Sequence, residues 1–248
     1  MEALRTIGGS GARCLAAGDA ALVVEFGDGV ERSLNARVLA AAASIRAAGL
    51  AGIIEVVPTF RSLMVHLDPL VTDPAALATA IGGLTMDEAK QSGTGRTVHI
   101  PVLYGGEAGP DLEPLAAECG LSPDDVVRRH GAVRFHAYML GFLPGFAYLG
   151  DLPVELRVPR LSEPRLRVPA GSVGVAGELT AVYPSESPGG WRLIGRTPIS
   201  LFDPAREQPS LLQPGDKVRF QAVDAGQFEA IEAACAAGRY EPKTEFSA

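Results

Sequence analysis

Two Pro-Arg dipeptides, Pro159-Arg160 and Pro164-Arg165, are the first feature of this sequence that suggests binding chemistry. Each proline fixes the backbone angle φ beside a guanidinium group, which reduces the entropy lost when that group binds a ligand. A guanidinium group binds a carboxylate or a phosphate through two parallel hydrogen bonds. The two dipeptides therefore predict that Arg160 and Arg165 bind an anion.

Two glycine-rich stretches follow the dipeptides, AGSVG at residues 170–174 and SPGGW at residues 187–191. Glycine leaves backbone N–H groups approachable, and Ser172 adds a hydroxyl group. The backbone at Gly171 and Ser172 is therefore a candidate cradle for an oxyanion. Tight turns would explain these glycines equally well.

Aromatic residues and one histidine precede the dipeptides. The stretch GFLPGFAYL at residues 141–149 places Phe142, Phe146 and Tyr148 around two bends, where the rings form either the wall of a pocket or part of the core. His130 follows a predicted helix and is a candidate proton donor or acceptor. The alternative that we favour is a structural one, in which its imidazolium caps the carboxyl end of the helix. His136 is interpreted as structural.

Charge is distributed unevenly along the chain. The 248 residues carry 22 − 29 = −7, which disfavours a nucleic-acid partner. From residue 131 to residue 200, however, seven arginines outnumber five acidic residues, so this segment carries +2 and the remainder −9. A cationic, loop-rich segment suits a small anionic ligand, although scattered surface arginines would give the same count.

Other classes of chemistry lack their usual signatures. Cys14, Cys119 and Cys235 are far apart and are interpreted as small apolar residues, and no His/Cys cluster has the spacing of a metal site. The motifs GxSxG, HExxH, the Walker lysine motif and a GxGxxG after a strand are missing. No stretch approaches ~20 continuous apolar residues, and no leader pattern opens the chain, so we expect a cytoplasmic protein without a metal.

The N-terminal part, residues 1–90, is predicted to be a small α/β domain. Residues 1–13 are interpreted as a loose tail, and the order strand, helix, strand, strand, helix favours helices on one face of a sheet. The expected elements are a strand from Ala20, a helix Leu34–Ala48 capped by Ser33, strands Ile53–Val57 and Leu63–Leu67, and a helix from Pro74 to Ile81. A polar linker is expected at residues 87–95.

The remainder, residues 91–248, is predicted to be rich in strands. A strand Thr97–Leu103 comes first, then helices Asp111–Cys119 and Ser122–Arg129, and a last helix Gln227–Ala237 ends the folded part. Between the helices, short segments separated by Gly/Pro loops have the spacing of a barrel or sandwich: Ala137–Gly141, Ser172–Ala176, Ala181–Tyr183, Trp191–Ile194, Ile199–Phe202 and Lys217–Val223. The fold class is therefore α+β.

The order of the motifs carries a family resemblance. The stretches YMLGFLPGFAYLG, PR-x3-PR, PAGSVGVAG, YPSESPGGW and IGRTP closely resemble the PxpB/KipI family, also called allophanate hydrolase subunit 1 or the carboxyltransferase-domain C-type component. They cover most of residues 101–220. The resemblance implies a ferredoxin-like N-terminal α/β sandwich followed by a cyclophilin-like β-barrel.

The resemblance also implies a function and partners. Members of the family join a PxpC/KipA-type subunit and a PxpA subunit of the LamB/YcsF type to form an ATP-dependent 5-oxoprolinase, which opens 5-oxo-L-proline to L-glutamate. Within that complex we expect Arg160, Arg165 and Arg196 to bind anionic groups of the substrate or of a phosphorylated intermediate. The remaining expected site residues are His130, Tyr138 and Ser172 for catalysis and Gly171, Phe142, Phe146, Tyr148 and Trp191 for substrate binding. Whether this chain itself binds the ATP is left open.

One stretch departs from the family pattern. Where the family reads AG-x-Q-T-G-[IV]-YP, this chain reads AGELTAVYP, with Leu179 at the glutamine position and Ala181 at the glycine position. Leucine cannot hydrogen-bond a lactam or a carboxylate, and a lost contact of this kind commonly costs ~1–3 kcal/mol. Two alternatives therefore stay open: a regulatory protein that inhibits a sensor histidine kinase, and a carboxyltransferase module of a urea carboxylase-like system.

Overall fold

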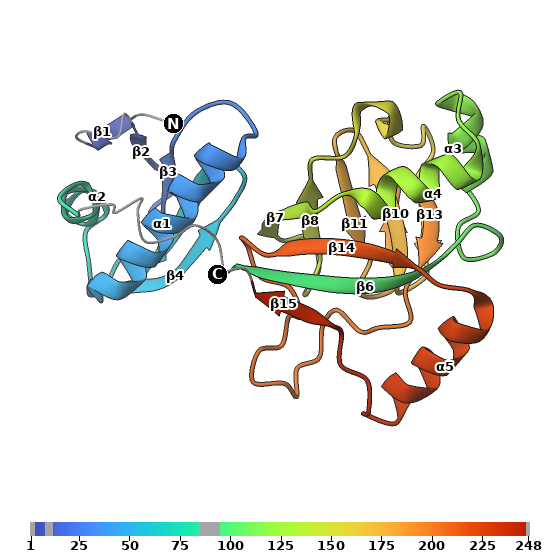
Figure 1. The fold of residues 1–248 in the computed structure, drawn as a ribbon. Coiled ribbons are helices and arrows are strands. Elements are labelled where there is room, and N and C mark those ends of the chain that lie inside the picture. Colours follow the sequence, from blue (N-terminus) through green and yellow to red (C-terminus); the bar gives the residue numbers. More distant parts are fainter. Residues whose placement is uncertain (1–2, 8–11, 85–94, 247–248) are drawn as a thin grey trace. The chain divides into compact units, whose positions relative to one another are not determined.

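The chain divides into two units, Met1–Gly93 and Thr94–Ala248, in a computed structural model that describes residues 3–7, 12–84 and 95–246 (Figure 1). Apart from Gly95, the predicted linker at residues 87–95 lies outside the described residues. Each unit has its own apolar core.

Unit 1 is an antiparallel sheet packed against two helices. The strand order is β1-β2-β3-β5-β4. Residues with small or branched apolar side chains on α1, such as Val38 and Ile45, pack with alternate strand residues such as Leu63 and Val65 in one core. The elements are β1 Ala3–Ile7, β2 Ala12–Ala16, β3 Ala21–Glu25, α1 Arg32–Ala48, β4 Ile53–Pro58, β5 Ser62–Leu67 and α2 Pro74–Gly82.

The topology of unit 1 confirms a ferredoxin-like sandwich with one rearrangement. The run β3-α1-β4-β5-α2 supplies the first five elements of the ferredoxin order, with β5 between β3 and β4. The sixth position, beside β3, is taken by β2 from the N-terminal side, paired from Arg13↔Glu25 to Ala16↔Leu22. The prediction of a loose tail is therefore wrong for residues 3–7 and 12–13, which belong to strands β1 and β2, because pairing of β1 with β2 and of β2 with β3 stabilises them. The rest of residues 1–13 lies outside the described residues.

Three capping residues were predicted for the helices of unit 1, and two of them are confirmed. Asp73 accepts hydrogen bonds from the backbone of Ala75 and Ala76, and Pro74 occupies the first turn, as predicted. Gly49, at φ 56°, ends α1, also as predicted. Ser33 is not the cap of α1, because the helix already begins at Arg32, after Glu31.

Unit 2 is a closed barrel of seven strands. Their order is β13-β10-β11-β8-β7-β14-β6, and β13 pairs with β6 to close the circle. The strands are β6 Arg96–Tyr104, β7 Phe135–Leu140, β8 Ala147–Gly150, β10 Ser172–Ala176, β11 Leu179–Val182, β13 Arg192–Arg196 and β14 Lys217–Ala222. Their inward side chains, among them Ile100, Phe135, Val175 and Phe220, form the core of the unit.

The remaining elements of unit 2 surround the barrel. A short strand β15 Thr244–Phe246 pairs with the start of β6, and β9 Arg165–Val168 pairs with β12 Ser187–Gly189 in a separate ribbon. The helices are α3 Leu112–Glu118, α4 Pro123–Ala132 and α5 Ala225–Ala236, with a 3-10 turn η2 at Val154–Leu156. The predicted strand Ile199–Phe202 is wrong: a single bridge, Phe202↔Ser210, stands in an otherwise irregular loop there.

Barrel closure depends on a glycine. A Cβ atom at Gly195 would lie 2.6 Å from Cγ1 of Val102 and 2.8 Å from the carbonyl oxygen of Leu103. Real Cβ atoms do not approach backbone so closely, and β13 and β6 can meet here because Gly195 has no side chain.

A buried ion pair joins β6 to the turn before β14. Asp216 is fully buried; its Oδ1 accepts a hydrogen bond from Nε of Arg96 at 3.1 Å, and its Oδ2 accepts one from the backbone of Gln213 at 2.8 Å. Arg96 also donates to the carbonyl of Leu211 at 2.8 Å. The parallel β6–β14 pairing thus begins beside a fixed turn.

We expect Asp216→Ala to lower the free energy of unfolding by about 3–5 kcal/mol, because it leaves a partly buried guanidinium without its carboxylate. Denaturant titration followed by circular dichroism measures this. As the control, Glu207→Ala at an exposed position should stay within about 0.5 kcal/mol of the unsubstituted protein. Equal stabilities of the two variants would contradict the role given to the ion pair.

Candidate functional site

An apolar cluster lies on the outer face of the barrel wall. We call it the outer cluster; it consists of Phe146, Val168, Ala176, Ala181, Tyr183, Trp191 and Leu193. Its strand residues alternate with residues of the barrel core, as Ala181 does with Val182 and Leu193 with Ile194. Tyr148 and Leu179 pack against it. Three of the predicted aromatic residues, Phe146, Tyr148 and Trp191, are therefore brought together, with ring centroids 5.0–6.2 Å apart.

Two glycines make room for the large rings. A Cβ atom at Gly189 would lie 2.4 Å from the hydroxyl oxygen of Tyr183, and one at Gly174 would lie 3.0 Å from Cβ of Trp191. These positions belong to the glycine-rich stretches that suggested an oxyanion cradle. Their glycines serve packing instead.

Phe142 stands at the margin of the outer cluster in a strained conformation. Its φ of 71° is in the left-handed region, which costs a residue with a side chain roughly 1–2 kcal/mol. Its ring is 62% exposed and meets Phe146 edge-on at 5.4 Å. An exposed aromatic ring held at such a cost suits a binding surface better than a core.

Arg160 lies over the ring of Trp191, with its guanidinium carbon 6.0 Å from the ring centroid. It is exposed, and no carboxylate pairs with it in the part of the chain that the structure describes. Burial raises the pKa of both Tyr148 and Tyr183. The charge of Arg160 acts in the opposite direction and lowers the pKa of each, but its effect is smaller than that of burial. An unpaired guanidinium beside an aromatic wall is suited to an anionic ligand.

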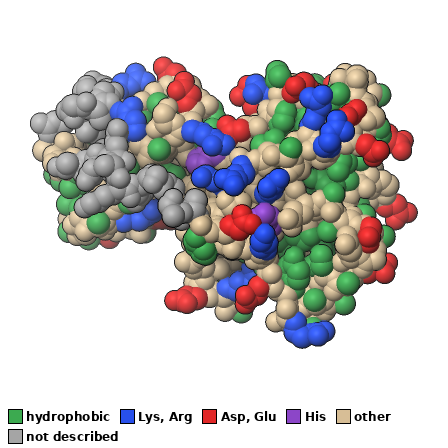
Figure 2. All heavy atoms as spheres, viewed as in Figure 1, with side chains coloured by type: hydrophobic (Ala, Val, Ile, Leu, Met, Phe, Trp, Pro, Cys, Tyr) green, Lys and Arg blue, Asp and Glu red, His purple; other side chains and the backbone are tan. Residues whose placement is uncertain are grey.

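Most neighbouring arginines are already neutralised by carboxylates. Basic and acidic side chains lie interspersed over the visible face of unit 2 (Figure 2). Arg165 donates to Asp111 at 2.7 Å, and Asp111 also accepts from the backbone of Leu193 at 2.6 Å. An anion at Arg165 would have to compete with Asp111. Further arginine pairs of the segment include Arg157–Glu178, Arg167–Glu186 and Arg192–Glu118.

Arg196 lies apart from Arg160. It ends β13, whereas Trp191 precedes the start of that strand. Its Nε donates to the carbonyl of Ala170 at 3.0 Å, and among the described residues no carboxylate pairs with it. The three arginines predicted to act together therefore occupy three different environments.

The backbone donors of the oxyanion cradle predicted at Gly171 and Ser172 are already engaged within the protein. The backbone N–H of Gly171 donates to the carbonyl of Tyr183 at 2.7 Å, and that of Ser172 donates to the carbonyl of Pro169 at 3.3 Å. Both donors are used, and Ser172 is only 2% exposed. Gly171 itself, at φ 80°, is required by the turn, where a Cβ atom would lie 2.3 Å from the carbonyl oxygen of Thr197.

His130 is buried in the barrel core. It is fully inaccessible to solvent and stacks on Phe220 at 4.7 Å. Its Nδ1 lies 2.8 Å from the hydroxyl of Tyr104, and its Nε2 lies 3.0 Å from the hydroxyl of Thr180. Burial lowers its pKa to about 3, so the ring is neutral near pH 7. The prediction that an imidazolium caps the helix is therefore wrong.

The hydrogen bonds of Thr180 decide where the proton of His130 lies. The Thr180 hydroxyl has one proton, and it donates that proton to the carbonyl of Gly174 at 2.9 Å. It must therefore accept from His130, which places the proton on Nε2. Nδ1 then accepts from the hydroxyl of Tyr104. Sequence reasoning missed Tyr104 and Thr180, because both are far from His130 in the sequence and the spacing of residues does not reveal contacts across a barrel.

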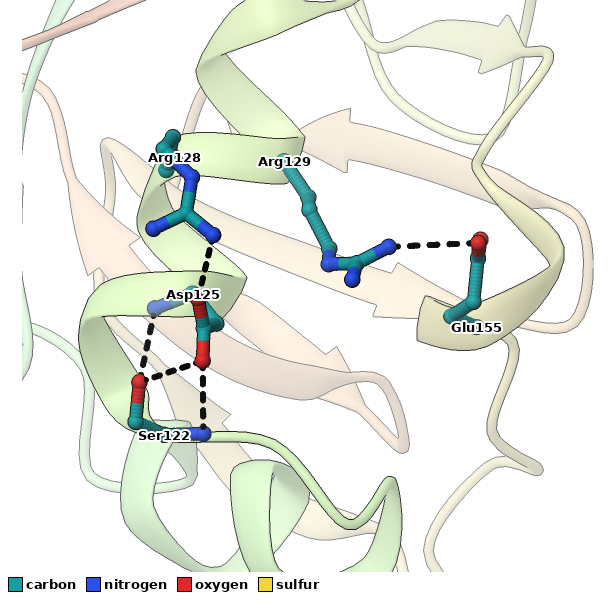
Figure 3. A network of polar contacts seen from close by, with 5 residues as sticks. All are labelled: Ser122, Asp125, Arg128, Arg129 and Glu155. Carbon is teal, nitrogen blue, oxygen red and sulfur yellow. Dashed lines mark hydrogen bonds and ion pairs between the residues drawn. The ribbon is translucent and has the colours of Figure 1, made fainter.

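Polar contacts secure the start of α4, the helix that carries His130, and tie this helix to η2 (Figure 3). Ser122 accepts from the backbone of Asp125 at 3.1 Å, and the carboxylate of Asp125 accepts from the Ser122 hydroxyl at 2.7 Å. Just before His130 along this helix, Arg128 pairs with Asp125, and Arg129 reaches Glu155 on η2 at 3.2 Å. The predicted start of this helix at Ser122-Pro123 is confirmed.

Tyr138 does not act beside His130 in this structure. Its ring is 3% exposed and packs against Gly150, where a Cβ atom would lie 2.2 Å from the ring. Its hydroxyl donates to Asp151 at 3.5 Å. The tyrosine bonded to His130 is Tyr104.

Metal centres and membrane-spanning helices are absent from the described residues. Within the ranges that the structure describes, no group of three His, Cys, Asp or Glu side chains could hold a metal ion. Among the helices described, none has the length and apolar character that a membrane span requires.

Comparison with known proteins shows the class and then the family. The fold is shared with part of the urea amidolyase of K. lactis, which matches with a TM-score of 0.77 at 20% identity, over 95% of this chain and 16% of that one. The model of the carboxyltransferase domain, subdomain C and D, matches residues 12–212, and the chain belongs to this family. The resemblance inferred from the motifs is confirmed.

Two curated relatives, both named as the B component of 5-oxoprolinase, are similar over nearly their whole length. The one from Escherichia coli O157:H7 is 45% identical over 214 residues, which are 84% of this chain and 95% of that protein. The one from Bacillus subtilis (strain 168) is 40% identical over 226 residues, which are 87% and 94% of the two chains.

We expect the ring of His130 to stay neutral, with its proton on Nε2, from pH 8 down to pH 5, as nitrogen-detected NMR of the imidazole can show. A histidine in the unfolded chain takes up its proton near pH 6.5, so the pH dependence has a defined sign. The unfolded state binds more protons below that pH, and the free energy of unfolding falls as the pH drops from about 6.5 toward 3.

In the variant His130→Gln, the free energy of unfolding should fall less steeply between about pH 6.5 and 3. The slope should decrease by an amount that corresponds to at most one bound proton. An imidazolium signal from His130 at pH 6 in the folded protein, or an unchanged slope in the variant, would contradict the buried neutral ring.

Proposed function

We propose that this protein is one subunit of an ATP-dependent 5-oxoprolinase, and that the complex opens 5-oxo-L-proline, or a related small lactam, to L-glutamate or its analogue. The similarity to two proteins named as the B component of 5-oxoprolinase, over more than four-fifths of the chain, carries the proposal. The expected partners are a PxpC/KipA-type subunit and a PxpA subunit of the LamB/YcsF type.

The surface that best suits the substrate is the margin of the outer cluster beside Arg160, since the members of the cluster are themselves buried. The carboxylate of 5-oxoproline pairs with the Arg160 guanidinium, which has no carboxylate partner among the described residues, and the ring lies against the half-buried Tyr148, because Trp191 itself is buried. Phe142 supplies a further exposed aromatic edge. These contacts bind and orient a substrate, and a group that cleaves the amide comes from elsewhere in the complex.

The described residues of this chain do not fit ATP on their own. A triphosphate needs several N–H donors and cations around one centre. Here the N–H groups of Gly171 and Ser172 are already used, and Arg160 and Arg196 flank opposite ends of β13. We therefore assign ATP to the complex and derive no step through it for this chain.

Leu179 makes the proposed surface more apolar than the family pattern. It packs against the outer cluster, in place of the carboxamide that the pattern carries there. A lactam with an apolar edge facing Leu179 can bind without a hydrogen bond at this point. A lactam with a polar group there would lose about 1–3 kcal/mol of binding free energy, because leucine offers no hydrogen-bond partner. Related lactams therefore belong in the test beside 5-oxoproline.

Reconstitution with the two partner subunits tests the proposal: glutamate release from 5-oxoproline should require ATP and this chain. In that assay we expect Arg160→Ala to lower kcat/KM by about 10- to 100-fold, the effect of losing charge-assisted hydrogen bonds. Arg167→Ala is the matched control, because Arg167 is exposed and paired with Glu186. Full turnover by Arg160→Ala would overturn the assignment of this arginine.

A carboxyltransferase module is the second candidate, favoured by the fold likeness to urea amidolyase. It predicts no glutamate release in the reconstituted system, and transfer of a carboxyl group once a biotin carrier protein is supplied. Binding to a sensor kinase with no turnover in either assay would favour the regulatory alternative.

A further inference from the structure

Unit 1 carries an exposed apolar tip at the turn between β5 and α2. We call Ile54, Leu70 and Val71 the apolar tip; these residues are 70%, 95% and 60% exposed. Single exposed apolar residues are ordinary on protein surfaces, but a group of large ones marks an interaction site.

Backbone contacts bring these residues to one end of the unit. Gly52 accepts a hydrogen bond from the backbone of Asp68 at 2.8 Å, and a Cβ atom at Gly52 would lie 2.5 Å from Cγ2 of Thr72. The segment that leads to Ile54 therefore runs against the turn that carries Leu70 and Val71.

Hydrogen bonds hold the turn in one shape. The carboxylate of Asp68 accepts from the backbone of Leu70 at 2.9 Å, and the carbonyl of Asp68 accepts from Val71 at 3.0 Å and Thr72 at 3.1 Å. A leucine presented in this way loses little entropy when a partner covers it.

The carboxylates around the tip lack cations. Glu55, Asp68 and Asp73 surround it in the sequence and the fold, and no Lys or Arg is paired with any of them in the described part of the chain. Within the described ranges, the hydrogen bonds to the carboxylates of Asp68 and Asp73 come from backbone N–H groups. A partner that covers the tip therefore gains most if its own rim is basic.

Strand addition at the neighbouring edge is a poor alternative. β4 is the last strand of the sheet, but Pro58 ends it without an N–H, its register shifts between Ile53 and Glu55, and the carbonyl of Val56 is occupied by Arg46 at 2.5 Å. These features are typical of an edge protected against pairing. The contact at this end is thus made by side chains.

We propose that the apolar tip docks another subunit of the complex, which receives Leu70 and Val71 in an apolar pocket rimmed by lysine or arginine. The proposal rests on the proposed function, because other subunits follow from the relatives being named as one component of 5-oxoprolinase. A second copy of this chain fits less well, since it would bring the same unpaired carboxylates against themselves.

The test is co-expression of this chain with both tagged partner subunits, with recovery of the chain on the tag as the readout. Leu70→Asp should reduce recovery at least about 10-fold, because it places a charge in an apolar pocket beside three carboxylates. Leu166→Asp is the matched control: Leu166 is 87% exposed on unit 2 and should leave recovery unchanged. Raising the salt concentration should weaken assembly of the unsubstituted chain.

The outcomes separate this proposal from the proposed function. If the unsubstituted chain assembles and supports ATP-dependent glutamate release, but Leu70→Asp assembles equally well, the tip is not the docking surface and the function stands. If the unsubstituted chain binds neither partner, both proposals are wrong. If Leu70→Asp changes self-association of the isolated chain and leaves assembly intact, the tip joins copies of this chain, and the proposal is overturned.

Discussion

The meeting of β13 with β6 is the constraint on which unit 2 depends. Seven short strands become a barrel because Gly195 allows β13 to lie against Val102 and Leu103 without a side chain between them. Closure sorts each strand into an inner and an outer face. The inner face makes the core that surrounds His130, and the outer face of the same strands makes the outer cluster on which Trp191 and Arg160 lie.

The two faces divide the polar chemistry between them. Inside, Tyr104, His130, Thr180 and the carbonyl of Gly174 form one hydrogen-bonded chain that is satisfied without charge. A buried network of this kind is stable because each donor has an acceptor. Outside, carboxylates neutralise most arginines, and Arg160 keeps its charge available. The neutral hydrogen-bonded chain and the charged residues thus lie on opposite faces of the barrel wall.

Local patterns predicted the elements of this protein better than its site. Asp73-Pro74 and Ser122-Pro123 start helices as predicted, because capping depends on residues adjacent in sequence. The alternating strand around Thr97–Leu103 and the segment Ser172–Ala176 were also predicted. The errors at residues 3–7, 12–13 and 199–202 arose where strand formation depends on a distant partner. At the N-terminal side β3 pairs with β2, whereas residues 199–202 have a single bridge, Phe202 to Ser210.

The order of the glycine, proline, aromatic and arginine motifs by itself determined the family and the stretch that carries the candidate site. The tertiary structure decided which of those residues are buried, paired with a carboxylate or exposed. Arg165 and Arg160 each follow a proline, yet only a fold that brings Asp111 near Arg165 distinguishes a paired guanidinium from an available one. The glycines at 171, 174 and 189 suggested an anion-binding loop in the sequence. In the folded protein, their lack of a side chain makes room for neighbouring residues. Electrostatic pairing and close packing act between residues far apart in the chain, and sequence spacing does not record those distances.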